Sequence, residues 1–523
     1  TTIAGTLTLN DSVVLLGTTQ TADYGLVMTG GALDMGGSDC KTGAVDISGG
    51  ALTPTTATWE VMSRKASNSN AWISVPSSFT NQGTLKFTSP LGGNIRTPQG
   101  MNNVIFDASS GTPTWTIVTQ GFQMVNLTIT DGTLDTGSDR GLVVTGATSV
   151  SGTLTCNAST ISLGSGKTDG YGLNVASGGT FTGGTGTHTW GSANLQASTT
   201  LTSGTTTING VGGGHNYAFW ADNNFTHNSG TVAFTRNGDQ KFGESGSDAP
   251  TRTFNNLTVN KAGGELTWET DNPFACVVAG NLTITAGELD TGPNNVALTV
   301  TGELNMQGGG NLTCNSSAVS VRNLYQTAGT LNLPDASGSF TVTGTGSGGG
   351  GDGYHIRLEG GTTTHNSGTV EITAASATAV RINAALYNLV LDSSGSGGAI
   401  QFIATTRLYG DLTLEDDFDF YSYNNSGTYY ALTVDGDVSI EGDNTLGRTE
   451  MNQNYSFGSL TIASGCTFIA TSGTTTITSE NSGNAWNNAG TFTHNKGLVK
   501  IAPSTDIGNT IVIEDTFYNI EYD

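Results

Sequence analysis

The chain has 523 residues and a net charge of −24, and only 11% of its residues are charged, against roughly 25% in an ordinary soluble domain. This acidic balance argues against a nucleic-acid binder, which needs basic stripes to replace the counterions of the phosphates, and against adsorption to anionic membranes. No apolar run approaches the roughly 20 residues that span a bilayer, so no membrane insertion is expected.

The apolar residues are mostly β-branched or aromatic, and they alternate with threonine and asparagine while 76 glycines punctuate the chain. Units of the form Gly-x-apolar-x-apolar occur at Gly5–Leu9, Gly280–Ile284, Gly329–Leu333 and Gly458–Ile462. A period of two places the apolar side chains on one face of a strand and the polar ones on the other. Because no segment shows a helical period, the sequence predicts an all-β fold of short strands with glycine at the bends.

A first motif recurs along the chain as FTNQGTLKF (Phe79–Phe87), FTHNSGTVAF (Phe225–Phe234), TTHNSGTVEI (Thr363–Ile372) and FTHNKGLVKI (Phe492–Ile501). Each copy carries a glycine at the same place; these are Gly83, Gly230, Gly368 and Gly497. Three copies also share a histidine, namely His227, His365 and His494. Self-similarity over long distances is the sequence signature of repeat architectures.

A second motif keeps the same phase and reads MNNVIFD, FNNLTVN, LYNLVLD and FYNIEYD, with its third residue always asparagine. These asparagines are Asn103, Asn256, Asn388 and Asn519. A third motif follows, NLTITDGTLDTG at Asn126 and NLTITAGELDTG at Asn281, and then an LVVTG-like element. Motifs in one order, four times over, predict four long repeats at residues 1–106, 107–259, 260–391 and 392–523, the first without its opening strands.

Two architectures fit this pattern. One is a β-solenoid, a mostly parallel β-helix of about 20 to 25 residues per coil, in which stacked coils bury one apolar column. The other is a row of four tandem β-sandwich domains. The frequent Gly-x-Leu-x-Ile units favour the solenoid, because every coil can reuse the same local solution, and hairpin turns such as Asn209-Gly210 are sporadic.

The repeats also separate structural residues from chemical ones, because a catalytic residue should occur once and a structural one should recur in phase. The three recurring histidines are therefore expected in turns or packing. Trp72, Trp220 and Trp486 each precede the first motif and are interpreted in the same way. Cys156 and Cys314 share a Leu-Thr-Cys-Asn context and are expected to be small buried residues. No catalytic residue, metal site or cofactor is assigned.

Acidic residues give the weaker candidates. One cluster contains Asp416, Asp417 and Asp419, and a second contains Asp435, Asp437, Glu441 and Asp443. Both are interpreted as solvated turns, because neither has the spacing of a calcium loop. Pairs such as Glu265/Glu269 and Glu288/Asp290 are expected on outward strand faces rather than across a cleft, where glycosidase chemistry needs them.

The segments FNNLTVNKAGGELTW, NLTITAGELDTG and FTHNSGTVAF resemble the repeats of large secreted β-solenoid proteins, found in bacterial surface adhesins and in bacteriophage tail fibres and spikes. The resemblance implies a non-enzymatic extracellular structural or adhesive protein, foremost a virion fibre or surface appendage component. The alternatives are a bacterial cell-surface adhesin or extracellular filament subunit, and a polysaccharide-degrading tailspike.

The expected partners are other copies of the chain or further repeats stacked end to end, and a host-surface glycan or protein. The fourth copy of the asparagine motif stops at Asp523, and Thr1–Asn10 enters at the next element of the cycle. A coil without a neighbour leaves unpaired backbone groups, so both ends are expected to abut more repeats or another subunit.

Overall fold

The computed structural model describes residues 1–523 except for 10–12, 20–21, 75–80, 97–99, 109, 120, 223, 245–250, 272, 345–353, 374–377, 393–397, 403, 416–417, 423–426, 480–483 and 504–514. The described residues form β-strands and no helix, and the strands stack mostly in parallel as a β-solenoid. Only isolated bridges in the described part, such as Gly212 with Tyr217, run antiparallel. The predicted solenoid is confirmed, and the alternative of tandem sandwiches is wrong, because antiparallel hairpins would dominate such sheets.

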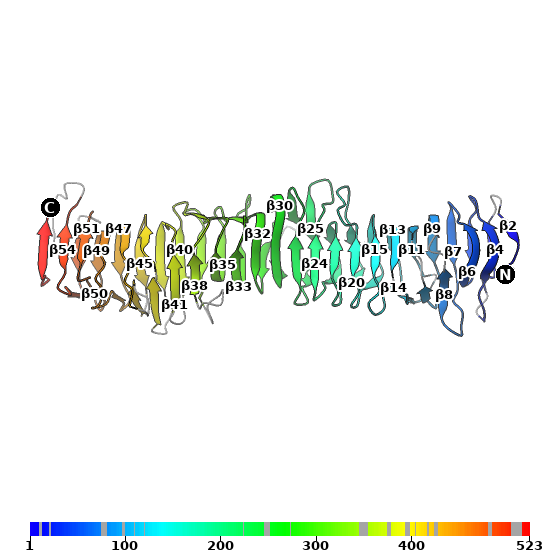
Figure 1. The fold of residues 1–523 in the computed structure, drawn as a ribbon, viewed down its shortest axis with the longest axis horizontal. Helices are drawn as coiled ribbons and strands as arrows, with labels where there is room; N and C mark the ends of the chain where they lie inside the picture. Colours follow the sequence, from blue (N-terminus) through cyan, green and yellow to red (C-terminus); the bar gives the residue numbers. More distant parts are fainter. Residues whose placement is uncertain are drawn as a thin grey trace. The chain divides into compact units, whose positions relative to one another are not determined.

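The chain divides into two compact units. Unit 1 contains Thr1–Asn256 and Asp271–Phe274, and unit 2 contains Leu257–Thr270 and Ala275–Asp523. In Figure 1, unit 1 runs from blue to green and unit 2 from green to red. One row of unit 1 stacks the strands β1 (Thr2–Ile3), β4 (Leu26–Asp34), β6 (Val45–Thr53), β8 (Asn70–Ser74), β10 (Gly93–Arg96), β12 (Thr114–Ile117), β14 (Thr133–Asp135), β17 (Thr153–Thr155), β20 (Thr180–Thr182), β23 (Ser198–Thr200) and β26 (Phe225–Thr226).

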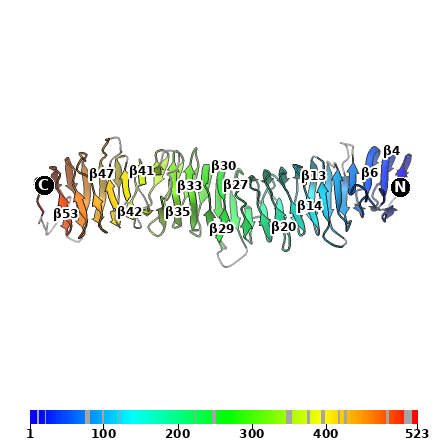
Figure 2. The same ribbon diagram turned by 90° about the horizontal axis from the view of Figure 1, so that it is seen from below.

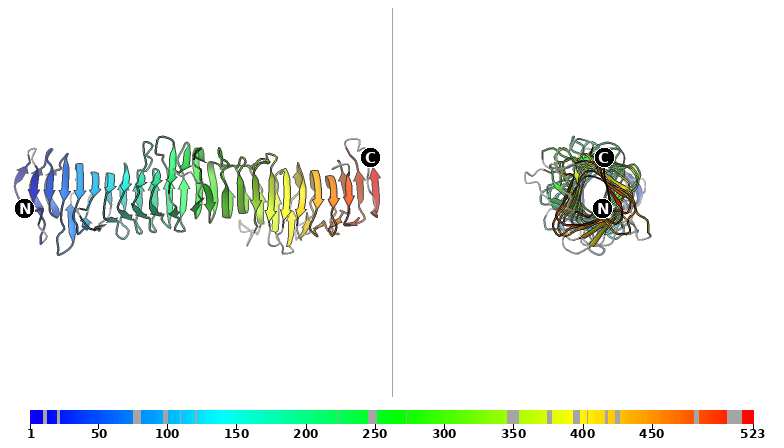
Figure 3. Two further views of the ribbon diagram at one scale, coloured as in Figure 1. Left: turned by 180° about the vertical axis from the view of Figure 1, so that it is seen from behind. Right: turned by 90° about the vertical axis from the view of Figure 1, so that its left-hand side faces the viewer.

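The described residues of unit 2 form three rows of strands, and Figure 2 and the left view of Figure 3 show how its coils follow one another. Row A stacks β31 (Ala275–Val278), β33 (Leu298–Met306), β35 (Ala318–Gln326), β37 (Ser339–Val342), β40 (Thr369–Thr373), β42 (Asn388–Asp392), β45 (Leu412–Glu415), β47 (Leu432–Ile440), β49 (Tyr455–Ile462) and β52 (Trp486–Asn488). Row B includes β38 (Tyr354–Leu358), β41 (Thr378–Ile382), β43 (Gly398–Phe402), β46 (Phe418–Tyr421), β48 (Thr445–Leu446), β50 (Thr467–Ile469) and β53 (Thr491–Thr493).

Row C includes β44 (Thr406–Leu408), the first halves of β47 and β49, then β51 (Thr474–Ile477), β54 (Leu498–Ile501) and β55 (Asn519–Tyr522). Long strands serve two rows because they bend. The register of β47 shifts between Val434 and Asp437, around Gly436. A side chain on Gly436 would meet the carbonyl oxygen of Gly410 at 2.7 Å, so glycine allows the corner to pack on the preceding coil.

The alternation of apolar and polar residues predicted from the sequence decides which side chains form the core. Leu282 and Ile284 are fully buried while Thr283 between them is half-buried, and the same pattern holds for Leu304 and Met306 in β33. Burying each such side chain contributes about 1.5 to 3 kcal/mol relative to leaving it exposed. Because every coil places residues of this kind inside, each unit has a continuous apolar column.

Coil length varies more than predicted. In the described register it ranges from 18 residues between Phe181 and its partner Thr199 to 32 residues between Leu324 and its partner Ile356. The strands keep their register while the connections at the corners take up the difference, because a surface loop tolerates extra length at little free-energy cost.

Candidate functional site

The recurring histidines lie in one type of tight turn, here called the His turn (the residues His-Asn-x-Gly). In each copy the histidine Nδ1 accepts the N–H of the residue two positions later, at 3.0 to 3.1 Å. The two central residues have left-handed backbone, with φ of 45 to 61°. The asparagine Nδ2 of two copies donates to a carbonyl oxygen of the preceding coil, from Asn228 to Leu201 at 3.1 Å and from Asn366 to Leu333 at 2.8 Å. His227, His365 and His494 therefore hold turns together.

The glycine that ends each His turn is required by close packing between coils. A Cβ at Gly368 would lie 2.1 Å from the carbonyl oxygen of Pro334, and one at Gly497 would lie 2.0 Å from that of Thr471. The corresponding distances are 2.0 Å at Gly230 and 2.1 Å at Gly83. These contacts are far inside van der Waals distance, so no larger residue fits without moving the backbone.

Copies of the His turn lie on different faces of the solenoid. In unit 2, Gly368 precedes β40 in row A, whereas Gly497 precedes β54 in row C. In unit 1, the copy of the first motif without a histidine places Gly83 within β9 (Asn81–Phe87), directly before the residues that pair with Asn103–Phe106 of β11 (Met101–Phe106). Gly230 precedes β27 (Thr231–Phe234), which stacks in another row on β24 (Thr205–Ile208). The local geometry around the motif glycine is therefore the same in each copy, but the copies precede strands of different rows. The similarity between the motifs did not reveal this difference in row.

Three asparagines of the second motif begin a strand, and Asn103 is the third residue of β11. Asn388 begins β42, and its N–H donates to the carbonyl of Gly368 at 3.2 Å. The N–H of Asn256 donates to Gly230 in the same way, at 3.1 Å. Each of these two motif copies thus lies on the His turn of the preceding coil, which explains why the asparagine motif follows the His turn one coil later.

The side-chain contacts of these asparagines are not uniform. Asn388 Oδ1 accepts the backbone N–H of Asp411 at 2.9 Å, the type of contact that the sequence predicts. Asn103 Oδ1 instead accepts Nδ2 of Asn126 at 2.9 Å. Asn519 is exposed in β55. Asn388 therefore makes the amide-to-backbone bond expected from the sequence, whereas Asn103 pairs with another side-chain amide.

A second repeated hydrogen-bond arrangement, between an aspartate, the glycine two positions later and an asparagine of the next coil, was not predicted from the sequence. Asp290 Oδ1 accepts the N–H of Gly292 at 2.8 Å and Nδ2 of Asn315, on the next coil, at 2.6 Å. In unit 1, Asp135 Oδ1 accepts the N–H of Gly137 at 2.7 Å and Nδ2 of Asn157 at 2.6 Å. The shared LDTG and LTCN segments carried the signal, since their Asp and Asn recur together. Both carboxylates are used in turn structure rather than in a reaction.

The tryptophans differ in their environments. Trp72 and Trp486 are fully buried, as expected of repeated core positions. Trp220 is half-buried on the outward side of β25 (Tyr217–Ala221), where Nε1 donates to Asp222 at 2.6 Å and the ring lies over Gly243. Trp220 is thus not a core residue, because its neighbours Phe219 and Ala221 take the inward positions.

All five cysteines are free and buried. Burial raises the pKa of Cys40 and of Cys276 to about 12, and it raises the pKa of Cys156 and Cys314 as well. The prediction that Cys156 and Cys314 are small buried residues is confirmed. A thiol held protonated in an apolar core is a poor nucleophile and a poor metal ligand.

His188 is the most buried histidine with a resolved pKa change, packing against Phe181 and Trp190 in unit 1. Burial lowers its pKa from 6.5 to about 4. Between these two pH values the unfolded chain binds a proton that the folded chain excludes, so stability falls as the pH falls.

We therefore expect unit 1 to lose roughly 3 kcal/mol of stability around His188 on acidification from neutral pH to about 4. Hydrogen exchange of β21 (His188–Trp190) at a series of pH values would measure this. His188→Leu should remove this part of the pH dependence, while the control His215→Leu, at an exposed position, should leave it intact. An unchanged pH profile in His188→Leu would contradict the assignment.

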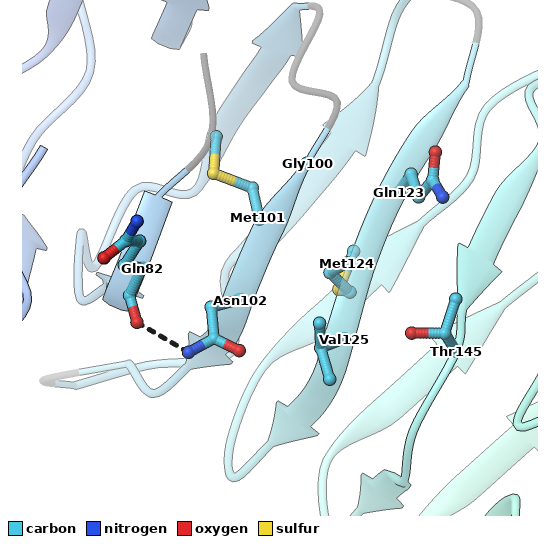
Figure 4. A pocket seen from close by; sticks show the side chains of 8 residues that line it. All are labelled: Gln82, Gly100, Met101, Asn102, Gln123, Met124, Val125 and Thr145. Carbon is cyan, nitrogen blue, oxygen red and sulfur yellow. Dashed lines mark hydrogen bonds between the residues drawn. The ribbon is translucent and has the colours of Figure 1, made fainter. Parts of the chain in front are cut away.

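An apolar cleft opens on unit 1, with a volume of about 330 Å³. Met101 and Met124, on neighbouring strands β11 and β13 (Phe122–Ile129), line it together with Val125 and Thr145 (Figure 4). Asn102 closes one side by donating to the carbonyl of Gln82 at 2.6 Å. The described lining side chains are thioethers, amides, a valine and a threonine, and none of them is a carboxylate, imidazole, amine or thiol.

The acidic candidates are engaged in local contacts. Asp416 and Asp417 lie outside the described residues, as do Phe79 and Thr80 of the shortest motif copy. In the second cluster, Asp435 pairs with Arg407 at 2.8 Å and Asp437 accepts Ser459 Oγ at 2.6 Å. Glu288 is half-buried and accepts Thr313 Oγ1 at 2.6 Å, so its carboxylate is also paired.

Comparison with known proteins finds no match to any protein-family profile, to any curated protein or to any solved structure. In the described residues no group of three or more His, Cys, Asp or Glu side chains is placed to hold a metal ion. Across the same residues, no helix is long and apolar enough to cross a membrane.

Proposed function

We propose that this protein is a non-enzymatic, extracellular structural and adhesive protein, and specifically a component of a virion fibre or surface appendage. The observation that supports the proposal most is how the recurring polar residues are used. The histidine, asparagine and aspartate of the repeated motifs form hydrogen bonds within turns and between neighbouring coils. Their chemistry is therefore devoted to stacking the coils, which leaves the outward side chains to meet partners.

The parallel stacking of the coils also supports the proposal that the chain associates end to end with other copies or further repeats. A parallel coil offers one edge of backbone N–H and C=O groups to each neighbour, so another copy of the chain or a further repeat can continue the ladders. A host-surface glycan or protein is the proposed target of the outward side chains. The acidic charge disfavours nucleic acid.

Two measurements test the proposal. Purified protein should release no reducing ends from a panel of bacterial capsular and cell-wall polysaccharides, and measurable release would show an enzyme. Immunoelectron microscopy with antibodies against this chain should label appendages outside the cell or on virus particles. Labelling confined to the cell interior would rule out the proposed role.

A further inference from the structure

One outward surface of unit 2 carries aromatic rings beside an ion pair. We define the aromatic strip as His365, Tyr387, Tyr409, Arg407 and Asp435. The His365 ring centroid lies 5.4 Å from that of Tyr387 and 5.3 Å from that of Tyr409. The Arg407 guanidinium lies 4.9 Å from the Tyr409 ring and binds Asp435 at 2.8 Å. Tyr409 is 44% exposed, whereas most large aromatic side chains of the chain are buried.

The backbone beneath the aromatic strip is fixed. His365 belongs to a His turn, so its Nδ1 is held by the N–H of Ser367 at 3.1 Å. On the next coils, Tyr409 donates its N–H to Leu386 at 2.9 Å, and Gly410 donates to Tyr387 at 3.0 Å. Three successive coils therefore present the rings from hydrogen-bonded backbone, and a binding surface built on rigid backbone loses little entropy when it is occupied.

The repeats show that the fold does not require these rings. The residue before the motif asparagine is Tyr387 here and Tyr518 in the fourth copy, but it is Asn102 and Asn255 in the first two copies. All four copies nevertheless carry the asparagine that follows. The tyrosines are thus an addition to a shared frame, and an exposed aromatic side chain with a polar end is typical of a binding surface.

The chemistry of the aromatic strip fits a sugar. The apolar C–H face of a hexose packs on an aromatic ring, and its hydroxyl groups pair with a guanidinium and a carboxylate, each of which makes strong charge-assisted hydrogen bonds. The net charge of −24 and the nearby exposed Asp411 oppose a polyanion. Arg407 is already paired with Asp435, so it offers no free cation to a uronic or sialic acid.

We propose that the aromatic strip binds a neutral polysaccharide, with sugar rings stacked on Tyr409 and Tyr387 and hydroxyl groups bound to Arg407 and Asp435. This inference rests on the proposed adhesive function and identifies its ligand class. The three rings of the aromatic strip come from successive coils and Asp435 comes from the next coil. At roughly 4.8 Å per coil, this length suits two to three sugar units of an extended chain.

Affinity electrophoresis of the full chain through gels containing dextran, mannan or laminarin tests the inference. Wild-type protein should be retarded by at least one of these neutral polymers and not by alginate. Tyr409→Ala and Tyr387→Ala should weaken the retardation at least about tenfold, while Tyr409→Phe, which keeps the ring, should retain most of it. Tyr518→Ala is the matched control, because Tyr518 is exposed beside His494, and among the described residues no arginine–aspartate pair is recorded next to its ring.

Three other results would contradict the inference or the proposed function on which it rests. Equal retardation of Tyr409→Ala and wild type, with thermal stability unchanged, would place binding elsewhere and reject the aromatic strip while leaving adhesion intact. Retardation by alginate alone, or by none of the neutral polymers, would reject a neutral polysaccharide as the ligand. Release of reducing ends from a gel polymer would instead overturn the proposed non-enzymatic function.

Discussion

Gly368→Ala is expected to destabilise unit 2 by roughly 3 kcal/mol, because the added methyl group would lie 2.1 Å from the carbonyl oxygen of Pro334. In a solenoid the damage should stay near the altered coil, since each coil contacts only its neighbours. Hydrogen exchange should therefore accelerate in β40, directly after the glycine, and much less in distant coils. The thermal transition should also shift downward.

Gly309→Ala is the matched control for this experiment. A Cβ at Gly309 would meet nothing within 4 Å, so the substitution should change stability by no more than about 0.5 kcal/mol. Equal effects of the two substitutions would show that loss of glycine flexibility, rather than contact with Pro334, is responsible. Normal exchange of β40 in Gly368→Ala would contradict the role assigned to the four motif glycines.

Trp486→Ala should cost about 3 to 5 kcal/mol, as expected for emptying the site of a fully buried tryptophan. Its ring centroid lies 4.9 Å from that of Phe492 and 5.4 Å from that of Phe517, and its Nε1 donates to Asp515 at 2.9 Å. The substitution would leave a cavity between coils and remove the hydrogen-bond donor of a half-buried carboxylate. Chemical denaturation and near-ultraviolet circular dichroism would measure the loss.

Trp220→Ala provides the comparison within the same predicted set. Trp220 is half-buried and faces outward, so its replacement should cost only about 1 to 2 kcal/mol. The difference between the two variants tests whether position relative to the core, rather than recurrence in the sequence, decides the contribution. A larger loss in Trp220→Ala than in Trp486→Ala would reverse this conclusion.

The fold could be predicted because its information is local. A strand of the type Gly280–Ile284 specifies which side chains face inward, and the glycines before β40 and β54 specify where one coil touches another. Buried Cys156 and Cys314 followed from the same periodicity. These features depend on neighbours in sequence or on a contact repeated in every copy, so a single chain reveals them.

Other features, such as the row on which a motif lies, depend on the number of strands between two copies of the motif. The similarity of the two copies does not reveal that number. The equivalence expected for Gly368 and Gly497 holds for their contacts but not for their faces, because the strands between them do not complete a whole number of coils. The outward orientation of Trp220 was likewise missed, since Phe219 and Ala221 are equally compatible with an inward position. The aromatic strip joins residues from four coils, and no local pattern links them.

One His turn precedes a strand of row A and another precedes a strand of row C. This difference has a consequence for how such a chain can gain or lose a repeat. Deleting the segment from Gly368 to Lys496 would rotate every later strand onto the neighbouring face while leaving each one preceded by a suitable turn. Since all rows bury alternate apolar residues, the rotated strands would still fill the column. Duplication or loss of a long repeat is thus compatible with folding but redirects everything displayed beyond it, so an ancestral chain could have gained new surfaces from copies of an old one.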